Sequence, residues 1–307
     1  MTIRHYYQDA TTKRFSATVT ERLIHNDRPA VLLDATYFYP TSGGQPHDTG
    51  RLSDGQATVA VVDVWSPKPG DPVVHILNQP WTGKDEVIGE IDWLRRFDHM
   101  QQHTGQHILS QALIRVAETE TVGFHLSKQT VTIDLDTAEL TSEQIQAAEQ
   151  LANEIIWANV PVDIRFASPE EASRLSLRKI PTKYDGEIRL IAIGDFDLTA
   201  CGGTHVTATG QIGQIKLLKT ERRGDSTRLE FCCGMRALDD YRHKHAVLTD
   251  LNSTLTTGYD DLAPSIGRLQ EEARQWRTTA SVLQKELSGY EANRLIEETQ
   301  PRKGSAS

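Results

Sequence analysis

The sequence predicts an α+β protein made of three consecutive parts. Short apolar runs between turn residues fill residues 1–90, helical and strand-like patterns mix over 91–235, and a heptad repeat dominates 236–300. A chain of 307 residues is too long for one small core, which favours several domains. We therefore expect a small all-β domain, an α/β domain and a helical coiled-coil segment, with a disordered tail at 301–307.

The composition is that of an ordinary soluble globular protein, with 38% hydrophobic and 24% charged residues. The chain has no run of about 18 apolar residues and no apolar signal core, so we expect no membrane span and a cytoplasmic location. Three cysteines, Cys201, Cys232 and Cys233, argue against a disulfide framework. With a net charge of −9, any nucleic-acid contact must come from a local basic patch.

The first 90 residues show the pattern of short strands. Apolar runs such as 30–33 and 59–62 are separated by turn clusters, among them Ser42-Gly43-Gly44 and Asp54-Gly55. Many short strands with regular turns are typical of a small barrel or a sandwich.

The pattern changes to a helical period after Asp92. Apolar and small residues recur every three or four positions up to Val116, and a second helix is expected at 142–158 with Thr141 or Ser142 as its N-cap. Further strands are expected at 131–135, 189–193, 214–218 and 227–232.

The C-terminal part carries a heptad seam that needs a partner. That partner is either an earlier helix of the same chain, in a hairpin, or a second subunit in a homodimer through residues 262–290. The seam consists of Leu262, Ile266, Leu269, Ala273, Trp276, Ala280, Leu283, Leu287 and Tyr290.

Two histidines lie one helical turn apart in the first predicted helix. His103 and His107 share one helix face, so both imidazoles can reach one metal ion. The pair resembles the zinc-peptidase helix motif, but Thr104 replaces the glutamate that acts as general base there. Taken alone, the pair could equally be two polar histidines on a helix surface.

A second ligand pair spans two glycines, in the segment from Cys201 to His205. Glycine lets the backbone turn tightly enough for a thiolate and an imidazole to converge. Alone, this segment could be a turn with a buried cysteine. Together with His103 and His107 it supplies three imidazoles and one thiolate, the donor set that zinc prefers, and this predicts a metal site.

A glycine-rich segment lies between aromatic residues and prolines, at 37–46. Physical reasoning alone favours a glycine turn flanked by packed aromatic side chains. The segment around Ser42-Gly43-Gly44-Gln45, the His103/His107 pair and the Cys201–His205 motif nevertheless occur in one specific order. In that order they closely resemble the editing domain of alanyl-tRNA synthetase and its free-standing relatives, the AlaX family, over residues 14–255.

The resemblance implies an N-terminal small β-barrel, a zinc-binding α/β editing domain and hydrolysis of Ser-tRNA(Ala), with Gly-tRNA(Ala) as a further candidate. It implies one Zn²⁺ per chain and the acceptor end of tRNA(Ala) as partner. The chain resembles the free-standing form and stops where longer relatives carry a Gly-rich RNA-binding domain, so weaker tRNA binding is expected. The implied metal ligands are His103, His107, Cys201 and His205.

Substrate and tRNA contacts are expected from two further sets of residues. The Gly-rich segment and His125, just after the first helix, are candidates for the amino-acid pocket, with Thr41 proposed to contact the serine hydroxyl. A turn-capping hydroxyl and an ordinary strand histidine are the alternatives for Thr41 and His125. The substrate candidates are Thr41, Gly43, Gly44, Gln45 and His125, and the tRNA candidates are Lys179, Lys183, Arg222 and Arg228.

Two questions stay open at this stage. Four protein ligands leave no free position on zinc, so the metal either activates water after a change in coordination or only positions the substrate. The competing function is a zinc-stabilised RNA- or protein-interaction module without catalysis.

Overall fold

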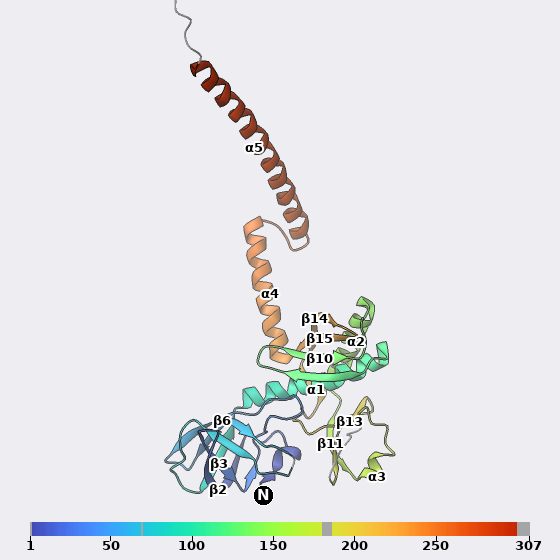
Figure 1. Cartoon of the computed structure of the whole chain (residues 1–307). Helices are drawn as coiled ribbons and strands as arrows, with labels where there is room; N and C mark the ends of the chain where they lie inside the picture. The colour runs from blue at the N-terminus through green and yellow to red at the C-terminus, as the bar shows by residue number, and fades with distance from the viewer. Residues whose placement is uncertain (1, 69, 180–185, 300–307) are drawn as a thin grey trace, which may run out of the picture. The chain divides into compact units, whose positions relative to one another are not determined.

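The computed structural model describes residues 2–68, 70–179 and 186–299 (Figure 1). The chain divides into two compact units, residues 1–239 and 240–307. Among the helices of the described residues, none is long and apolar enough to cross a membrane. The tail predicted at 301–307 and the tRNA candidate Lys183 lie outside the described residues.

A closed six-stranded barrel occupies the N-terminal part, with the hydrogen-bonded order β2-β3-β7-β6-β5-β8. The first seven residues of β2 alternate between exposed and buried, as expected for a strand with one face on a core. Phe15, Val31 and Leu52 belong to that core. The barrel is confirmed, and the sandwich alternative is excluded. The strands are β1 Ile3–Arg4, β2 Arg14–His25, β3 Arg28–Leu33, β4 Ala35–Thr36, β5 Gly50–Ser53, β6 Thr58–Trp65, β7 Val74–Leu77 and β8 Glu86–Ile91, with the 3₁₀ helix η1 at His5–Tyr7.

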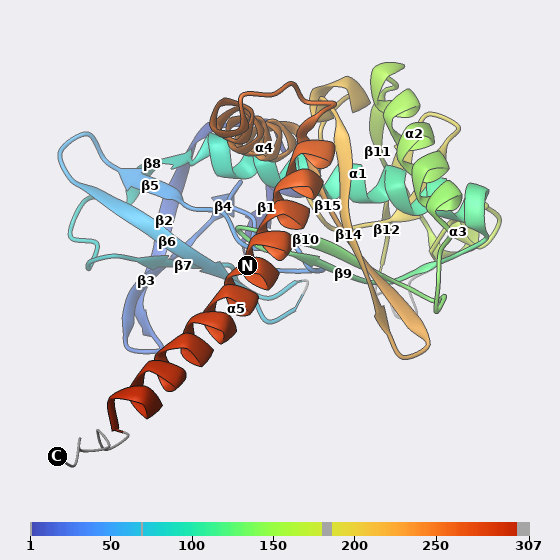
Figure 2. The ribbon, with the colours of Figure 1, turned by 90° about the horizontal axis from the view of Figure 1, so that it is seen from above.

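The α/β part begins with α1 (Trp93–Ala117), whose N-cap Asp92 accepts a hydrogen bond from the backbone of Arg95. Thr141, not Ser142, caps α2, and Gln144 completes a capping box. The two helices cover one face of the antiparallel sheet β14-β15-β10-β9 and share a core with it (Figure 2). A second sheet has the order β11-β12-β13.

The remaining elements of the chain are these: α2 Ser142–Trp157, α3 Pro169–Ala172, α4 Gly234–Leu255, α5 Leu262–Thr299, β9 Thr121–Leu126, β10 Val131–Leu135, β11 Val162–Ala167, β12 Ile188–Ile193, β13 Asp197–Ala200, β14 Ile215–Arg223, β15 Ser226–Cys233 and the 3₁₀ helix η2 Thr209–Ile212.

A buried ion pair fastens the barrel to α1. The side chains of Arg96 and Asp48 are both fully buried, and the Arg96 guanidinium holds the carboxylate through Nε and Nη2. The same guanidinium donates to the backbone oxygens of Ala10, at 2.8 Å, and Tyr37. Removing one partner of such a pair leaves an uncompensated buried charge, which typically costs about 3–5 kcal/mol.

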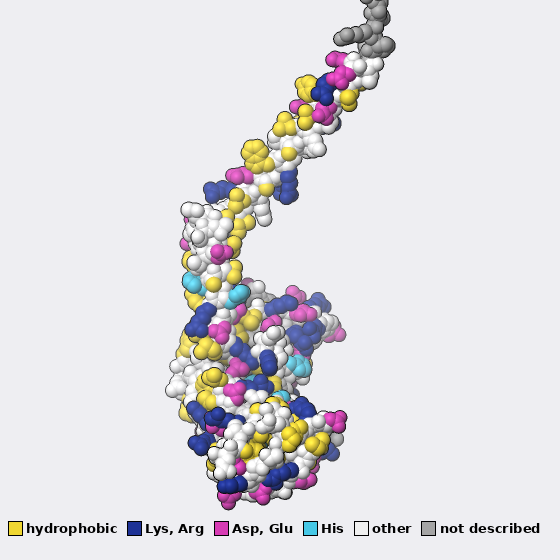
Figure 3. Space-filling model, turned by 90° about the vertical axis from the view of Figure 1, so that its left-hand side faces the viewer, with side chains coloured by type: hydrophobic (Ala, Val, Ile, Leu, Met, Phe, Trp, Pro, Cys, Tyr) yellow, Lys and Arg dark blue, Asp and Glu magenta, His cyan; other side chains and the backbone are white. Residues whose placement is uncertain are grey.

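The heptad seam of α5 is uncovered in the single chain. Trp276, Leu283 and Tyr290 are 72%, 57% and 75% exposed. Figure 3 shows hydrophobic side chains at the surface along this C-terminal helix. The side chains of the seam are thus exposed in the described residues, and both the coiled coil and its partner stay predictions.

The barrel should become less stable in mild acid because of His75. This side chain is fully buried, contacts Thr36 Oγ1 at 2.8 Å through Nε2, and burial lowers its pKa from 6.5 to about 4. The folded pKa lies below the unfolded one, so this contribution is complete above pH 6.5 and is lost as the pH falls towards 4. The loss should reach about 3 kcal/mol.

Urea unfolding of wild type and His75→Gln, measured from pH 7 to pH 4, checks this. The variant should show the flatter pH dependence. Parallel pH profiles for the two proteins would contradict the assignment.

Candidate metal centre and active site

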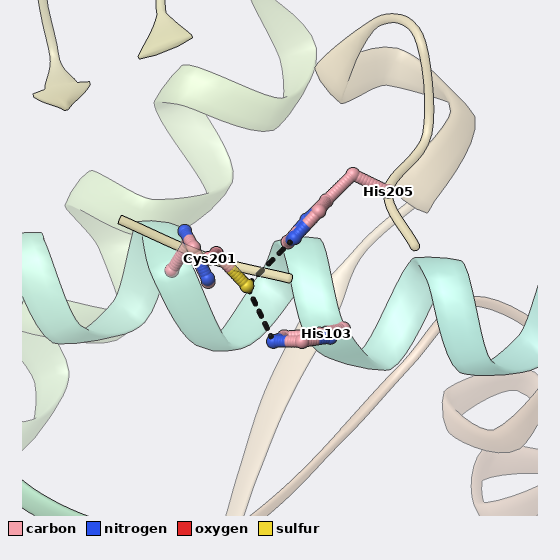
Figure 4. A group of neighbouring side chains, drawn as sticks. His103, Cys201 and His205 are labelled. Atoms are coloured by element: carbon pink, nitrogen blue, oxygen red, sulfur yellow. Dashed lines mark hydrogen bonds between the residues drawn. The ribbon is translucent and has the colours of Figure 1, made fainter. Parts of the chain in front are cut away.

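Four buried or half-buried side chains from distant parts of the chain meet at one point. One ligand atom from each of His103, His107, Cys201 and His205 lies within 4.8 Å of the others. Cys201 Sγ is 3.5 Å from His103 Nε2 and 3.3 Å from His205 Nε2 (Figure 4). Tetrahedral zinc with these ligands sets neighbouring donor atoms about 3.3–3.8 Å apart, and the two distances from Cys201 Sγ lie in that range.

Each imidazole turns its Nδ1 away from the cluster, towards an oxygen. His103 Nδ1 donates to Gln45 Oε1 at 2.8 Å, and His205 Nδ1 lies 3.2 Å from Thr104 Oγ1. His107 Nδ1 lies 3.5 Å from Asp197 Oδ2. A proton held on Nδ1 leaves the Nε2 lone pair for a metal, which is the usual arrangement at histidine ligands.

Electrostatics favour the metal-binding forms of Cys201 and His205. Burial alone would raise the pKa of Cys201, but the neighbouring charges of His103, His205 and His107 hold the pKa well below its usual value. Burial is the main cause that lowers the pKa of His205 well below 6.5. A thiolate and a neutral imidazole are the states that bind metals.

The pKa of His107 shifts in the opposite direction. Burial alone would lower it, but the Cys201 charge and the Asp197 carboxylate outweigh burial and raise it. For Asp197 itself, burial would raise the pKa, but His107 and Arg178 hold it below its usual value. Negative charge from the Cys201 thiolate and the Asp197 carboxylate therefore faces His107, and the Arg178 guanidinium offsets part of it.

Two glycines in the motifs are required by close packing. A Cβ on Gly105 would lie 2.3 Å from Cys233 Sγ, so this glycine lets α1 approach β15. A Cβ on Gly203 would lie 2.1 Å from His103 Cε1, so the Cys201–His205 loop packs directly on a ligand ring. These approaches, rather than chain flexibility, explain the two glycines.

The Gly-rich segment reaches the metal centre through Gln45. This fully buried side chain accepts from His103 Nδ1 and from the backbone of Thr204, and it donates to Thr204 Oγ1 at 2.8 Å. Gly44 has a φ of +83°, and its Cβ would lie 2.5 Å from the backbone oxygen of Phe124. A residue of the N-terminal part, Gln45, thus helps to hold the imidazole of His103 in place.

A cavity of about 400 Å³ opens beside the ligands. His103, His107 and Cys201 form one wall, and Phe124 stacks on the His103 ring with centroids 5.1 Å apart. The other lining residues include Gly43, Gln106, Arg178, Lys179 and Thr199. A small amino-acid moiety fits in such a space beside a metal ion.

Among the predicted site residues, Gln45 contacts His103 and Gly44 packs against Phe124, and the others fall into two groups. The four ligands, Gly43 and Lys179 lie at the cluster or its cavity. Thr41 and His125 are not among the residues that line the cavity: Thr41 Oγ1 accepts from the backbone of His47, and the largely exposed His125 side chain lies 3.7 Å from Asp134.

The basic candidates also differ in their surroundings. Arg228 forms a two-pronged ion pair with Asp134 at 2.6 and 2.7 Å, whereas Arg222 Nε donates to the backbone of Gly224 in the β14–β15 turn. Lys179 is exposed at the cavity.

Four residues at the site were missed by sequence reasoning. Thr104 was noted only as a missing glutamate, although its spacing, one residue after a ligand, could have suggested a supporting role. The roles of Phe124, Arg178 and Asp197 beside the cluster could not be inferred from a local pattern, because strand pairing and a loop bring them to the site.

Comparison with known proteins agrees with this geometry. Residues 188–230 match the family described as threonyl and alanyl tRNA synthetase second additional domain, and residues 5–95 match tRNA synthetases class II (A). The alanyl-tRNA editing protein AlaX-L of Pyrococcus horikoshii is 36% identical over 282 residues, covering 89% of this chain and 68% of that protein. The chain belongs to the alanyl-tRNA editing protein family.

Two other relatives show how far the resemblance extends. The alanyl-tRNA editing protein Aarsd1-A of Xenopus laevis is 33% identical over 84% of this chain and 62% of its own length. Alanine–tRNA ligase of Pyrococcus abyssi is 35% identical over 92% of this chain. The chain spans only 31% of that ligase.

Gly203→Ala should weaken Zn²⁺ binding at least tenfold, because the new methyl group displaces the His103 ring, and disturbed ligand support typically costs 10- to 100-fold. Gly202→Ala is the matched control, since its Cβ meets only Tyr7, at 3.7 Å. Competition with a chromophoric chelator measures both affinities. Equal affinities for the two variants would show that packing on His103 does not matter.

Proposed function

We propose that this protein is a trans-editing deacylase that hydrolyses the aminoacyl ester of mischarged Ser-tRNA(Ala), with Gly-tRNA(Ala) as a second candidate substrate. The observation that supports it best is the cluster of three imidazoles and one thiolate beside a cavity of about 400 Å³. We propose one Zn²⁺ per chain as its occupant, because the ligands match zinc in number and type. The names of the relatives supply the tRNA(Ala) part of the proposal.

The reaction is the attack of water on the ester carbonyl, with the ribose oxygen as leaving group. A bound zinc ion would supply either Lewis acidity and water activation or a fixed anchor for the substrate. The chain's own residues shape the space: Phe124 and the Gly43 backbone border the amino-acid cavity, and the ligand rings close it on one side. The cavity therefore has room for the aminoacyl group and for the attacking water beside the cluster.

Serine is to be distinguished from alanine by one hydroxyl. A polar group placed to meet that hydroxyl is left unpaired when alanine binds, which can give discrimination on the order of 10⁴-fold. Among the proposed substrate-binding residues Thr41, Gly43, Gly44, Gln45 and His125, Gly43 has the most direct support because it lines the cavity. Gln45 supports His103, so we propose that it acts on the substrate through that ligand.

For the tRNA acceptor end we propose Lys179 as the first contact. It is exposed and borders the cavity, next to Arg178, so a phosphate near the 3′ end would meet positive charge there. Arg222 is a second candidate, but it does not line the cavity. Arg228 could contact a phosphate only after its ion pair with Asp134 breaks.

Deacylation of Ser-tRNA(Ala) by the zinc-loaded protein tests the proposal, with Ala-tRNA(Ala) as the substrate control. Cys201→Ala should reduce serine release by at least about 100-fold, because it removes a ligand of the proposed metal centre. Cys232→Ala is the matched variant, since this buried thiol is outside the ligand cluster, and it should keep near wild-type activity. If wild type released no serine above the uncatalysed rate, the enzyme proposal would fail.

The exposed seam of α5 supports a second proposal, pairing with another copy of the chain. Leu269 and Leu283 are 49% and 57% exposed, which is costly for a helix that stays alone in water. The same surface is what favours the alternative function, an interaction module without catalysis. That alternative requires zinc binding without deacylation.

Light scattering of the full chain in solution should give the mass of a dimer. The double variant Leu269→Glu/Leu283→Glu should shift it to a monomer, because each copy would bury like charges in the seam. Thr278→Glu, on the opposite helix face, should leave the mass unchanged. A monomeric wild type at high micromolar concentration would rule out the dimer.

A further inference from the structure

A carboxylate and a guanidinium stand directly behind one metal ligand. Asp197, the first residue of β13, has a fully buried side chain whose Oδ2 lies 3.5 Å from His107 Nδ1. Arg178 grips both oxygens of that carboxylate, with Nε 2.7 Å from Oδ1 and Nη2 3.2 Å from Oδ2. The Arg178 backbone also donates to the Leu198 oxygen, at 2.8 Å, and this fixes the loop against β13.

The three histidines therefore have unequal support. His103 and His205 are oriented by neutral oxygens, those of Gln45 and Thr104. His107 alone faces a carboxylate. A carboxylate behind an imidazole holds the proton on Nδ1 and makes Nε2 a more basic ligand.

Arg178 orients the Asp197 carboxylate as well as providing a positive charge. A two-pronged guanidinium–carboxylate contact fixes the plane of the carboxylate, which lysine in the same place would not do. Its side chain is only 10% exposed and also borders the substrate cavity, so the pair connects the cavity wall to a ligand.

We propose that Arg178 and Asp197 are the positioning residues of His107, and that they set the affinity of the centre for its metal. The pair orients the imidazole so that Nε2 faces Cys201 and the other two histidines. This inference rests on the metal centre of the proposed function, but not on the identity of the substrate.

Zn²⁺ affinity, measured by chelator competition on the full chain, tests this without any activity assay. Asp197→Asn keeps the shape but loses the charge, and should weaken binding roughly 10- to 100-fold. Arg178→Lys keeps the positive charge but loses the two-point contact with Asp197, and it should weaken Zn²⁺ binding by less than Asp197→Asn does. The matched control is Asp134→Asn, which breaks a similar two-pronged pair, with Arg228, on β10 and β15.

Co²⁺ substitution gives a second readout, because its visible absorption reports ligand geometry. The spectrum should change in Asp197→Asn and stay as in wild type in Asp134→Asn. Thermal unfolding of the metal-free proteins shows whether Asp197→Asn is folded; Arg178→Lys supplies the test if it is not.

The outcomes separate this inference from the proposed function. Wild-type Zn²⁺ affinity in both Asp197→Asn and Arg178→Lys, or an equal loss in Asp134→Asn, would overturn it. A wild type that binds no Zn²⁺ would overturn the inference together with the metal centre. If the expected order of affinities held while Ser-tRNA(Ala) was not deacylated, the inference would stand and the substrate assignment would fall.

Discussion

The buried ion pair of Arg96 and Asp48 is the contact on which the site depends. It joins the barrel to α1 seven residues, or two helical turns, before His103, so both residues lie on the same side of the helix. With the barrel held there, Gln45 reaches His103 and the Gly-rich segment meets β9. A charge pair without access to water tolerates little displacement, which makes the junction rigid.

The cluster of His103, His107, Cys201 and His205 could be predicted from the sequence because the geometry of each pair is local. One helical turn separates His103 from His107, and a short glycine loop separates Cys201 from His205, so spacing alone brings each pair together. The short strands of the N-terminal part were also foreseeable, but their pattern left a barrel and a sandwich open, and only the family resemblance favoured the barrel. The partner of the α5 seam was not, since a heptad pattern is the same for a hairpin and for a dimer.

The residues that hold the side chains of the cluster in place could not be predicted, because their positions depend on contacts between distant parts of the chain. Asp197 lies in a strand whose sequence looks like any buried strand, and Arg178 lies in a loop; only the pairing of β12 with β13 and the loop contact bring them behind His107. Gln45 was expected at the substrate, but the fold directs its side chain to a ligand ring instead. Thr41 was expected there too, and its hydroxyl is engaged by His47.

The hydrogen bond from His103 to Gln45 has a consequence for how this architecture can be divided. The ligands all belong to the α/β part, so that part looks like a portable module. Yet one ligand obtains its tautomer from a barrel residue, 58 positions away in sequence. A graft of the α/β part onto another scaffold would need a substitute acceptor for His103 Nδ1, because Phe124 and Gly203 pack on the ring but do not fix its tautomer.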